Sequence, residues 1–438
     1  MPSGDVSRDT IAAIATAPGR AGVGVIRISG GKVRHIAQAL LGSLPAPRHA
    51  DLRSFRDASG EAIDQGIALY FPAPHSYTGE DVLELQGHGG PVVQQRLLAA
   101  CLDAGARVAE PGEFTRRAYL EGKLDLAQAE AVADLIDAAS AEAARSAMRS
   151  LAGEFSSRVN ALVAQLLELR ALIEAMLDFP EEEVDSLHRD DAAARLARTR
   201  AILEDVLGKS RQGSLLRAGI RAVIAGRPNV GKSSLLNRLA GEERAIVTPM
   251  AGTTRDALRE AIEIDGVPLT VVDTAGLRAS ADPIERLGIE RTHQELQQAD
   301  LVIAVHEAAA AEGIADLPEG NRIDVYNKID LHPGFAPPPG AIAVSAKTGE
   351  GLDALRQAIL RAAGWTSTGE SVFLARERHL RALEEARGHL EGAARSAAQW
   401  EFFAEELRLA QVALGRITGA VSADDLLGEI FARFCIGK

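Results

Sequence analysis

Two kinds of hydrophobic pattern divide this chain. Short apolar runs bounded by glycine and proline predict strands near the N-terminus, over residues 10–16, 23–29, 62–71 and 82–86. A helical spacing of apolar residues covers residues 92–104, after the break Gly87-His88-Gly89-Gly90-Pro91. Because strands and helices are mixed in this part, we predict an N-terminal α+β domain over residues 1–122.

Long helical patterns dominate the next part of the chain and its last part. Apolar residues three or four apart run from Val159 to Leu177, and Asp125 can cap an earlier run that reaches Ala139. Further helical patterns cover residues 190–208, 376–398, 401–414 and 423–434. Since a different pattern separates these segments, we predict a discontinuous helical domain formed by residues 123–219 and 364–438.

The inserted segment, residues 220–363, contains strand-like runs that predict a mostly parallel α/β sheet. The run 220–225 leads into Gly226-Arg227-Pro228-Asn229-Val230-Gly231-Lys232-Ser233, and a helical pattern follows. This is the strand–loop–helix setting of the phosphate-binding P-loop. Backbone amides and the helix N-terminus would bind phosphates, Lys232 would reach the β- and γ-phosphates, and Ser233 would ligate Mg²⁺.

Later motifs indicate that the base is guanine. In Asn327-Lys328-Ile329-Asp330, the Asp330 carboxylate can accept hydrogen bonds from guanine N1–H and N2–H₂, donors that adenine lacks. Ser345-Ala346-Lys347 offers backbone donors to guanine O6. In Asp273-Thr274-Ala275-Gly276, Asp273 would join the Mg²⁺ shell and the Gly276 amide would sense the γ-phosphate. With Thr253 and Thr254, which follow Gly252, these motifs predict a Ras-like P-loop GTPase domain.

One position departs from the Ras-like pattern. Leu277 follows Gly276, where a glutamine orients the attacking water in Ras-like sites. A leucine can neither donate nor accept a hydrogen bond, so another polar group must hold the water. Acidic residues lie just downstream at Asp282 and Glu285, although composition alone favours a surface charge at Glu285.

Charge and cysteine content bound the remaining interpretations. The 438-residue chain has a formal net charge of −13, which argues against a nonspecific nucleic-acid coat but leaves room for a local basic site. There are two cysteines, and neither a signal peptide nor a membrane span is indicated, so we expect a soluble cytoplasmic protein. One cluster could form a metal site: Glu80, Asp81, Glu84 and His88. Their spacing is not diagnostic of metal binding, so a solvated turn with a loop histidine is favoured there.

Taken together, the motifs resemble those of the MnmE (TrmE) family of tRNA-modification GTPases. The resemblance covers nearly the whole chain, including the N-terminal segments Pro18-Gly19-Arg20, Leu83-Glu84-Leu85-Gln86-Gly87-His88-Gly89-Gly90, Pro111-Gly112-Glu113-Phe114 and 123–130. The ending Cys435-Ile436-Gly437-Lys438 is specific to that pattern.

The resemblance implies a folate-binding and dimerising N-terminal domain and a K⁺-stimulated GTPase domain that dimerises around K⁺. It also implies a flavin-dependent partner, MnmG, with which a carboxymethylaminomethyl/aminomethyl-type group is added at C5 of the wobble uridine of certain tRNAs. A tetrahydrofolate derivative supplies the carbon. By motif match, Arg27, Glu84, Lys123 and Lys438 contact the folate, Cys435 is functionally important and Glu285 positions the catalytic water. The K⁺ ligands are Asn229, Thr248, Met250 (through its carbonyl) and Thr253.

The predicted nucleotide site then comprises seventeen positions: Asn229, Val230, Gly231, Lys232, Ser233, Ser234, Thr248, Thr253, Thr254, Asp273, Gly276, Asn327, Lys328, Asp330, Ser345, Ala346 and Lys347. We expect Lys232 and Glu285 to be catalytic, and Ser233 and Thr254 to hold Mg²⁺. One departure from the family pattern is His306-Glu307, where many relatives have an aspartate. A GTP-switch assembly factor, for example for ribosomes, with flanking binding modules is the alternative function.

Overall fold

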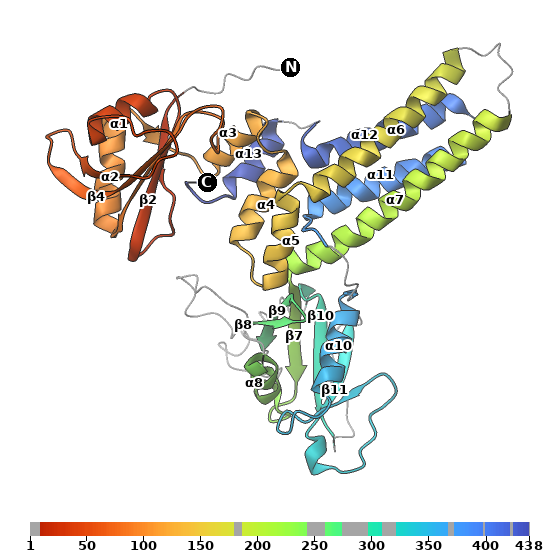
Figure 1. Ribbon diagram of the computed structural model, residues 1–438. Helices are drawn as coiled ribbons and strands as arrows, with labels where there is room; N and C mark the ends of the chain where they lie inside the picture. Colours follow the sequence, from red (N-terminus) through yellow and green to blue (C-terminus); the bar gives the residue numbers. More distant parts are fainter. Residues whose placement is uncertain are drawn as a thin grey trace, which may run out of the picture. The chain divides into compact units, whose positions relative to one another are not determined.

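The computed structural model describes residues 9–178, 186–242, 259–273, 297–308, 321–366, 372–396, 399–420 and 424–437. These residues belong to two compact units (Figure 1). The first comprises Met1–Ala133 with Gly415–Lys438, and the second comprises Asp134–Leu414. The chain therefore returns to its first unit at its C-terminus. The predicted domain boundaries differ from this division and stay predictions.

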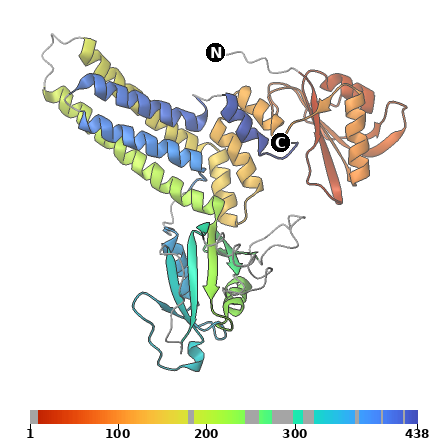
Figure 2. The same cartoon turned by 180° about the vertical axis from the view of Figure 1, so that it is seen from behind.

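The first unit is built on a sheet of β1 (Ile11–Ile14), β2 (Ala21–Ser29), β3 (Asp51–Arg56), β4 (Ala62–Phe71), β5 (Val82–Gly89) and β6 (Arg107–Val108). Its order is β3-β4-β5-β2-β1-β6, with β6 parallel to β1 and the other neighbours antiparallel. Helices α1 (Val33–Leu41) and α2 (Pro91–Asp103) cover one face (Figure 2). Their apolar side chains, such as Ile36 and Leu97, join one buried core with Ile28 and Leu85.

A second, smaller core of the first unit joins its two chain segments. Helices α3 (Glu113–Leu120), α4 (Leu126–Ile136) and α13 (Asp424–Ala432) meet there, and Leu126 packs with Phe431 and Phe434. Beyond α13, the Gly112 amide donates to Cys435 O at 3.3 Å, and Pro111 pairs with Ile436. These backbone contacts place the C-terminal residues beside the start of α3.

The helical part of the second unit contains α5 (Ala141–Leu151), α6 (Glu154–Asp178), α7 (Ser186–Ala218), α11 (Glu377–Arg395) and α12 (Trp400–Thr418). Two predictions from periodicity were wrong in detail. The pattern that reached Ala139 breaks after Ile136, because Ser140 caps a new helix by accepting from the Ala143 amide. The pattern over residues 190–208 lies within the longer helix α7.

The second sheet has β7 (Ile220–Gly226), β8 (Arg259–Ile264), β9 (Val267–Asp273), β10 (Leu301–Glu307), β11 (Arg322–Asn327) and β12 (Ile342–Ala343). Its order is β12-β11-β10-β7-β9-β8, and only the β8–β9 pair is antiparallel among the described strands. Helices α8 (Lys232–Glu242) and α10 (Leu352–Ala362) contribute to its core with the nearly continuous apolar strand β7. The predicted α/β class with a mostly parallel sheet is confirmed.

Candidate functional site

The predicted nucleotide motifs meet at one edge of the second sheet. Strand β7 ends at Gly226, where the P-loop begins, and β11 ends at Asn327, the first residue of the guanine motif. Strand β10 lies between them, and β12 ends two residues before Ser345. Ligands of open α/β sheets bind beyond this carboxyl edge of the strands. The topology therefore brings the predicted phosphate- and base-binding segments to the same side.

The P-loop, residues 226–233, has a backbone that few side chains would permit. Asn229 and Gly231 have φ angles of 68° and 92°, in the region that favours glycine and tolerates asparagine. Lys232 Nζ donates to the carbonyl oxygens of Gly226 at 2.9 Å and Arg227 at 3.2 Å. The ammonium group thus lies against the loop, where it can meet phosphate oxygens.

Asn327 connects the P-loop to the base-recognising loop. Its amide nitrogen donates to Val230 O at 2.9 Å, and its Oδ1 accepts from the Ala346 amide at 3.0 Å. Asn327 is 2% exposed, so both bonds are shielded from water. A Cβ on Gly231 would lie 2.4 Å from the same amide nitrogen. One buried side chain therefore sets the distance between the two loops, and Gly231 leaves space for it.

The Asp330 carboxylate is held by the neighbouring loop. Asp330 lies in the short 3₁₀ helix η1 (Ile329–Leu331), and its Oδ1 accepts from Ser345 Oγ at 2.7 Å. Ser345 is fully buried and accepts in turn from the Thr348 amide at 3.1 Å. The Ala346 amide is bonded to Asn327, whereas Lys347 is exposed. That backbone amides of this loop donate a hydrogen bond to guanine O6 stays a prediction.

The departure His306-Glu307 has a local structural explanation. His306 is 5% exposed, its Nε2 lies 2.8 Å from Asp324 Oδ1, and its ring stacks on Tyr326 with 4.9 Å between centroids. Glu307 Oε1 accepts from Lys328 Nζ at 3.1 Å. Both residues therefore make contacts with β11 and the residue that follows it.

Part of the predicted nucleotide site lies outside the described residues: Thr248, Met250, Thr253, Thr254, Gly276, Leu277, Asp282 and Glu285. The side chain of Asp273 is also outside them. Of the remaining predicted residues, Val230 is buried, while Asn229, Ser233 and Ser234 are exposed around the start of α8. The structure thus brings together the P-loop and the two base-recognising motifs, and the switch-region predictions stay untested.

A second polar site lies in the first unit, around Arg27 on β2. Arg27 Nε donates to Glu84 Oε1 on the neighbouring strand at 2.9 Å, and its Nη1 donates to Gly437 O at 3.5 Å. The guanidinium carbon lies 5.3 Å from the ring centroid of Tyr77 and 5.9 Å from that of Phe114. A partly exposed cation flanked by aromatic rings suits a ligand that carries both a flat ring and an anionic group.

The other predicted residues of this site are placed less closely. Lys123 is exposed, and its Cε lies 3.4 Å from where a Cβ on Gly79 would be. Cys435 is exposed beside Gly112, and Lys438 lies outside the described residues. Arg27, Glu84 and the C-terminal backbone are therefore brought together, with Lys123 on the neighbouring loop.

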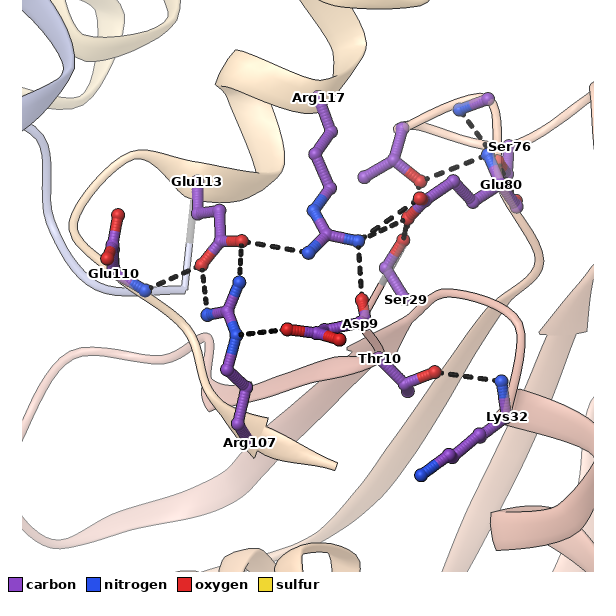
Figure 3. Close-up of polar contacts among 12 residues, drawn as sticks. Asp9, Thr10, Ser29, Lys32, Ser76, Glu80, Arg107, Glu110, Glu113 and Arg117 are labelled. Atoms are coloured by element: carbon purple, nitrogen blue, oxygen red, sulfur yellow. Dashed lines mark hydrogen bonds and ion pairs between the residues drawn. The ribbon is translucent and has the colours of Figure 1, made fainter. Parts of the chain in front are cut away.

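A partly buried ion network joins α3 to the segment that contains Glu80 (Figure 3). Arg117 on α3, which is 3% exposed, donates to Glu80 and Glu113, and Arg107 donates to Glu113 through both Nη atoms. Burial alone would raise the pKa of Glu113, but hydrogen bonds from Arg107, the Glu110 amide and Arg117 lower it to about 2. Sequence reasoning missed this network and the rings of Tyr77 and Phe114; the motif Pro111-Gly112-Glu113-Phe114 contained the available signal.

The residues of the alternative metal site are divided among different partners. Glu80 binds Arg117, Glu84 binds Arg27, Asp81 binds Arg34, and His88 Nδ1 lies 2.7 Å from Asp64 Oδ1. Within the residues that the structure describes, no group of three or more His, Cys, Asp and Glu side chains could hold a metal ion. None of the described helices is long and apolar enough to cross a membrane.

Comparisons with known proteins match both units. The family model described as MnmE helical domain matches residues 126–435, and the model described as GTP-binding protein TrmE N-terminus matches residues 10–123. A relative from Azoarcus sp., "tRNA modification GTPase MnmE", is 61% identical over 98% of both chains. A protein of the same name from Thiobacillus denitrificans is 60% identical over 98% of both chains. The solved FeoB G-domain from Methanococcus jannaschii aligns with 33% of this chain and 98% of its own at 25% identity, with a TM-score of 0.27 that supports no conclusion.

Proposed function

Because the chain belongs to the MnmE family of tRNA modification GTPases, we propose that GTP binds across the P-loop and the Asn327–Asp330 segment and is hydrolysed there with K⁺ and Mg²⁺. The chain is a GTPase that acts in tRNA modification. The observation that carries the proposed site is the buried Asn327 side chain, which bonds to Val230 O and to the Ala346 amide.

Each described loop has one task in this proposal. The P-loop amides and Lys232 bind the β- and γ-phosphates, and the preset loop backbone costs no reorganisation during hydrolysis. Asp330 accepts hydrogen bonds from guanine, with Ser345 holding one of its oxygens. Ser233 and Thr254 would ligate Mg²⁺, and Asn229, Thr248, Met250 and Thr253 would ligate K⁺. These cations, when bound, offset negative charge that develops between the phosphates.

The fit of the described residues to these cations rests on donor chemistry. Both ions prefer oxygen ligands, and the P-loop offers the Ser233 hydroxyl and the Asn229 amide oxygen. Asn229 is exposed, and its positive φ is a backbone conformation that asparagine tolerates. This donor set supports the proposal, and the ligands outside the described residues complete it by motif match.

We further propose that the Arg27 site binds a tetrahydrofolate derivative, which supplies one carbon to C5 of the tRNA wobble uridine together with the flavoprotein MnmG. Arg27 and Lys123 would meet anionic groups of the folate, Glu84 would accept hydrogen bonds from its donors, and Lys438 would add a cation. The observation that supports this assignment is the Arg27 guanidinium, which lies over the rings of both Tyr77 and Phe114.

An exposed apolar strand pair supports the proposed homodimer. Leu52 on β3 and Ile67 on β4 are direct cross-strand partners, and they are 68% and 38% exposed. Val23 on β2 is 59% exposed. Apolar side chains grouped on a sheet are typical of a protein interface. We assign this region of the first unit to contact with a second copy of the chain.

Wobble nucleosides test the function directly. In cells lacking this protein, mass spectrometry should show loss of the C5-modified wobble uridine, and the parent gene should restore it. Lys232→Ala should fail to restore it, because phosphate binding is lost. Unchanged wobble nucleosides in the deletion strain would overturn the proposal and favour the assembly-factor alternative.

A further inference from the structure

Two separate segments supply the aromatic rings beside Arg27. Tyr77 lies between β4 and β5, and Phe114 lies in the first turn of α3. The Tyr77 hydroxyl contacts Thr115 Oγ1 at 2.9 Å, which is one direct link between the segments. The distance between the rings therefore depends on what holds residues 76–80 against α3.

Arg117 provides the main ionic link between these segments (Figure 3). Its Nη1 donates to Glu80 Oε1 at 3.1 Å and Oε2 at 3.0 Å, and its Nη2 donates to Glu113 Oε1 at 2.8 Å. The same Nη1 donates to Asp9 O at 2.8 Å, next to the start of β1. One guanidinium thus joins a loop carboxylate, a helix carboxylate and the N-terminal backbone.

Both carboxylates are themselves fixed to other elements. Glu80 Oε2 accepts from Ser29 Oγ on β2 at 2.7 Å. Glu113 accepts from Arg107 at 2.6 and 2.8 Å and from the Glu110 amide at 2.9 Å. The Arg117 and Glu113 side chains are 3% and 8% exposed, so solvent screens the bond between them little, whereas the Glu80 and Arg107 side chains are 24% and 38% exposed. The network is a rigid connection between β2, the residue 76–80 loop and α3.

The bridge requires an arginine. A guanidinium directs donors from two separate nitrogens in a fixed plane, whereas a lysine ammonium is a single point on a flexible stem. Arg117→Lys keeps the charge but cannot span Glu80 and Glu113 with the same geometry. The loop carrying Tyr77 would then lose its ionic tie to α3 and would keep the contact between Tyr77 and Thr115.

We propose that Arg117 is a positioning residue of the Arg27 site, acting by holding the loop that carries Tyr77 against α3. The role rests on the proposed folate binding at this site. Because Arg117 is 3% exposed, we assign it no direct contact with the folate; it would set where the Tyr77 ring lies relative to the Arg27 guanidinium. The same loop contains Gly79, against which Lys123 lies, so a displaced loop alters the surroundings of two predicted ligand contacts.

The test measures 5-formyltetrahydrofolate affinity of the full-length protein by calorimetry. Arg117→Lys should bind about tenfold more weakly than the parent protein, since two directed bonds are lost. Glu80→Gln, which removes the charge on the loop side, should also bind more weakly. The matched control is Arg116→Lys on the neighbouring, exposed position of α3, which should bind like the parent. GTP hydrolysis should be unchanged in every variant, which reports that the second unit is folded.

A double-mutant cycle separates positioning from general destabilisation. In a Tyr77→Leu background, Arg117→Lys should change folate affinity by less than about twofold, because the group it positions is gone. A tenfold loss in both backgrounds, or an unchanged affinity in Arg117→Lys alone, overturns the positioning role. Arg27→Ala separates failure of the positioning role of Arg117 from failure of the proposed folate site. Suppose that the parent protein binds folate, that Arg27→Ala does not, and that Arg117→Lys binds like the parent: only the positioning role of Arg117 then fails. If the parent protein does not bind folate, the proposed folate site fails as well.

Discussion

Ser345 donates its hydroxyl hydrogen to Asp330 Oδ1 across 2.7 Å, and so orients the carboxylate that is proposed to read guanine. The hydroxyl is itself fixed, because it accepts from the Thr348 amide at 3.1 Å and is fully buried. A carboxylate oriented before the ligand arrives loses little freedom on binding. Selectivity for guanine is therefore expected to depend on Asp330 and on its support by Ser345.

Replacing the carboxylate by an amide should change base selectivity. Asp330→Asn should weaken GTP binding by about 1.5–3 kcal/mol, because two charge-assisted hydrogen bonds are lost. The variant should favour the binding of xanthosine triphosphate. Fluorescent nucleotide titration measures both affinities. Asp353→Asn on α10, whose side chain is 96% exposed, is the control and should leave both affinities unchanged. GTP affinity within about twofold of the parent protein would count against the assignment.

Gly231 should not tolerate a methyl group. Its φ of 92° is unfavourable for alanine, and the added Cβ would lie 2.4 Å from the Asn327 amide nitrogen. Gly231→Ala should therefore break the link between the P-loop and Asn327. The affinity for GTP should fall by tenfold or more, and tenfold corresponds to about 1.4 kcal/mol. The control is Gly241→Ala in α8, where nothing lies within 4 Å of the added carbon. Equal GTP affinity of the two variants would contradict this account.

The two units differ in how much of each site could be predicted from the amino-acid sequence alone. The P-loop is one continuous segment with the strand and helix it requires, so Lys232 and Ser233 could be placed from the motif. The contact between Asn327 and Val230 could not, because it joins the ends of β7 and β11 across β10. That neighbourhood depends on strand order, which spacing along the chain does not encode.

The first unit was less predictable for a related reason. Strands β2, β4 and β5 matched apolar runs. Strand β3 was missed because its apolar residues, Leu52 and Phe55, do not alternate with polar ones, whereas α1 was missed although its apolar residues have helical spacing. The pairing of Arg27 with Glu84 needs the register of β2 against β5. The buried Arg117 would be assigned to the surface by residue type, since an arginine is rarely buried unless paired.

The Glu113 carboxylate makes the stability of the first unit depend on pH. Its pKa is lowered from 4.5 to about 2, so its ionised form stabilises the folded state fully above pH 4.5, and this stabilisation is lost as the pH falls toward 2. Urea denaturation should show a lower free energy of unfolding at pH 3 than at pH 6. Glu113→Gln should be less stable at pH 6 and show a smaller difference between the two pH values. An unchanged pH dependence in that variant would contradict the assignment.

Potassium should accelerate GTP hydrolysis more than sodium. Asn229 is exposed on the P-loop, and the resemblance places K⁺ between its side chain and ligands from residues 248–253. Rates in KCl should exceed those in NaCl at equal ionic strength by about tenfold, since one preorganised charge near the developing negative charge has an effect of that size or more. Asn229→Gly, which permits the same positive φ but lacks the amide oxygen, should remove the difference. Equal rates in the two salts would refute the proposed K⁺ site.

Catalysis should depend on Glu285, which lies outside the described residues. Leu277 removes the side-chain amide that orients water in Ras-like sites, so a polar group must reach the attacking water from elsewhere. A carboxylate within about 2.6–3.2 Å of that water can orient it and accept its proton. Glu285→Ala should lower the single-turnover rate by about 10²-fold while nucleotide affinity stays unchanged. This pattern marks an interaction made mainly in the transition state.

The alternative for Glu285 is a surface salt bridge with Arg286 or Arg291. Losing an exposed pair costs at most about 1 kcal/mol and would leave turnover within a few-fold of the parent protein. Single-turnover hydrolysis measured beside a nucleotide titration separates the two outcomes. Asp282→Ala is the matched comparison, because it removes a neighbouring carboxylate. If Asp282→Ala abolishes hydrolysis and Glu285→Ala does not, the water is held by Asp282 and the assignment to Glu285 is wrong.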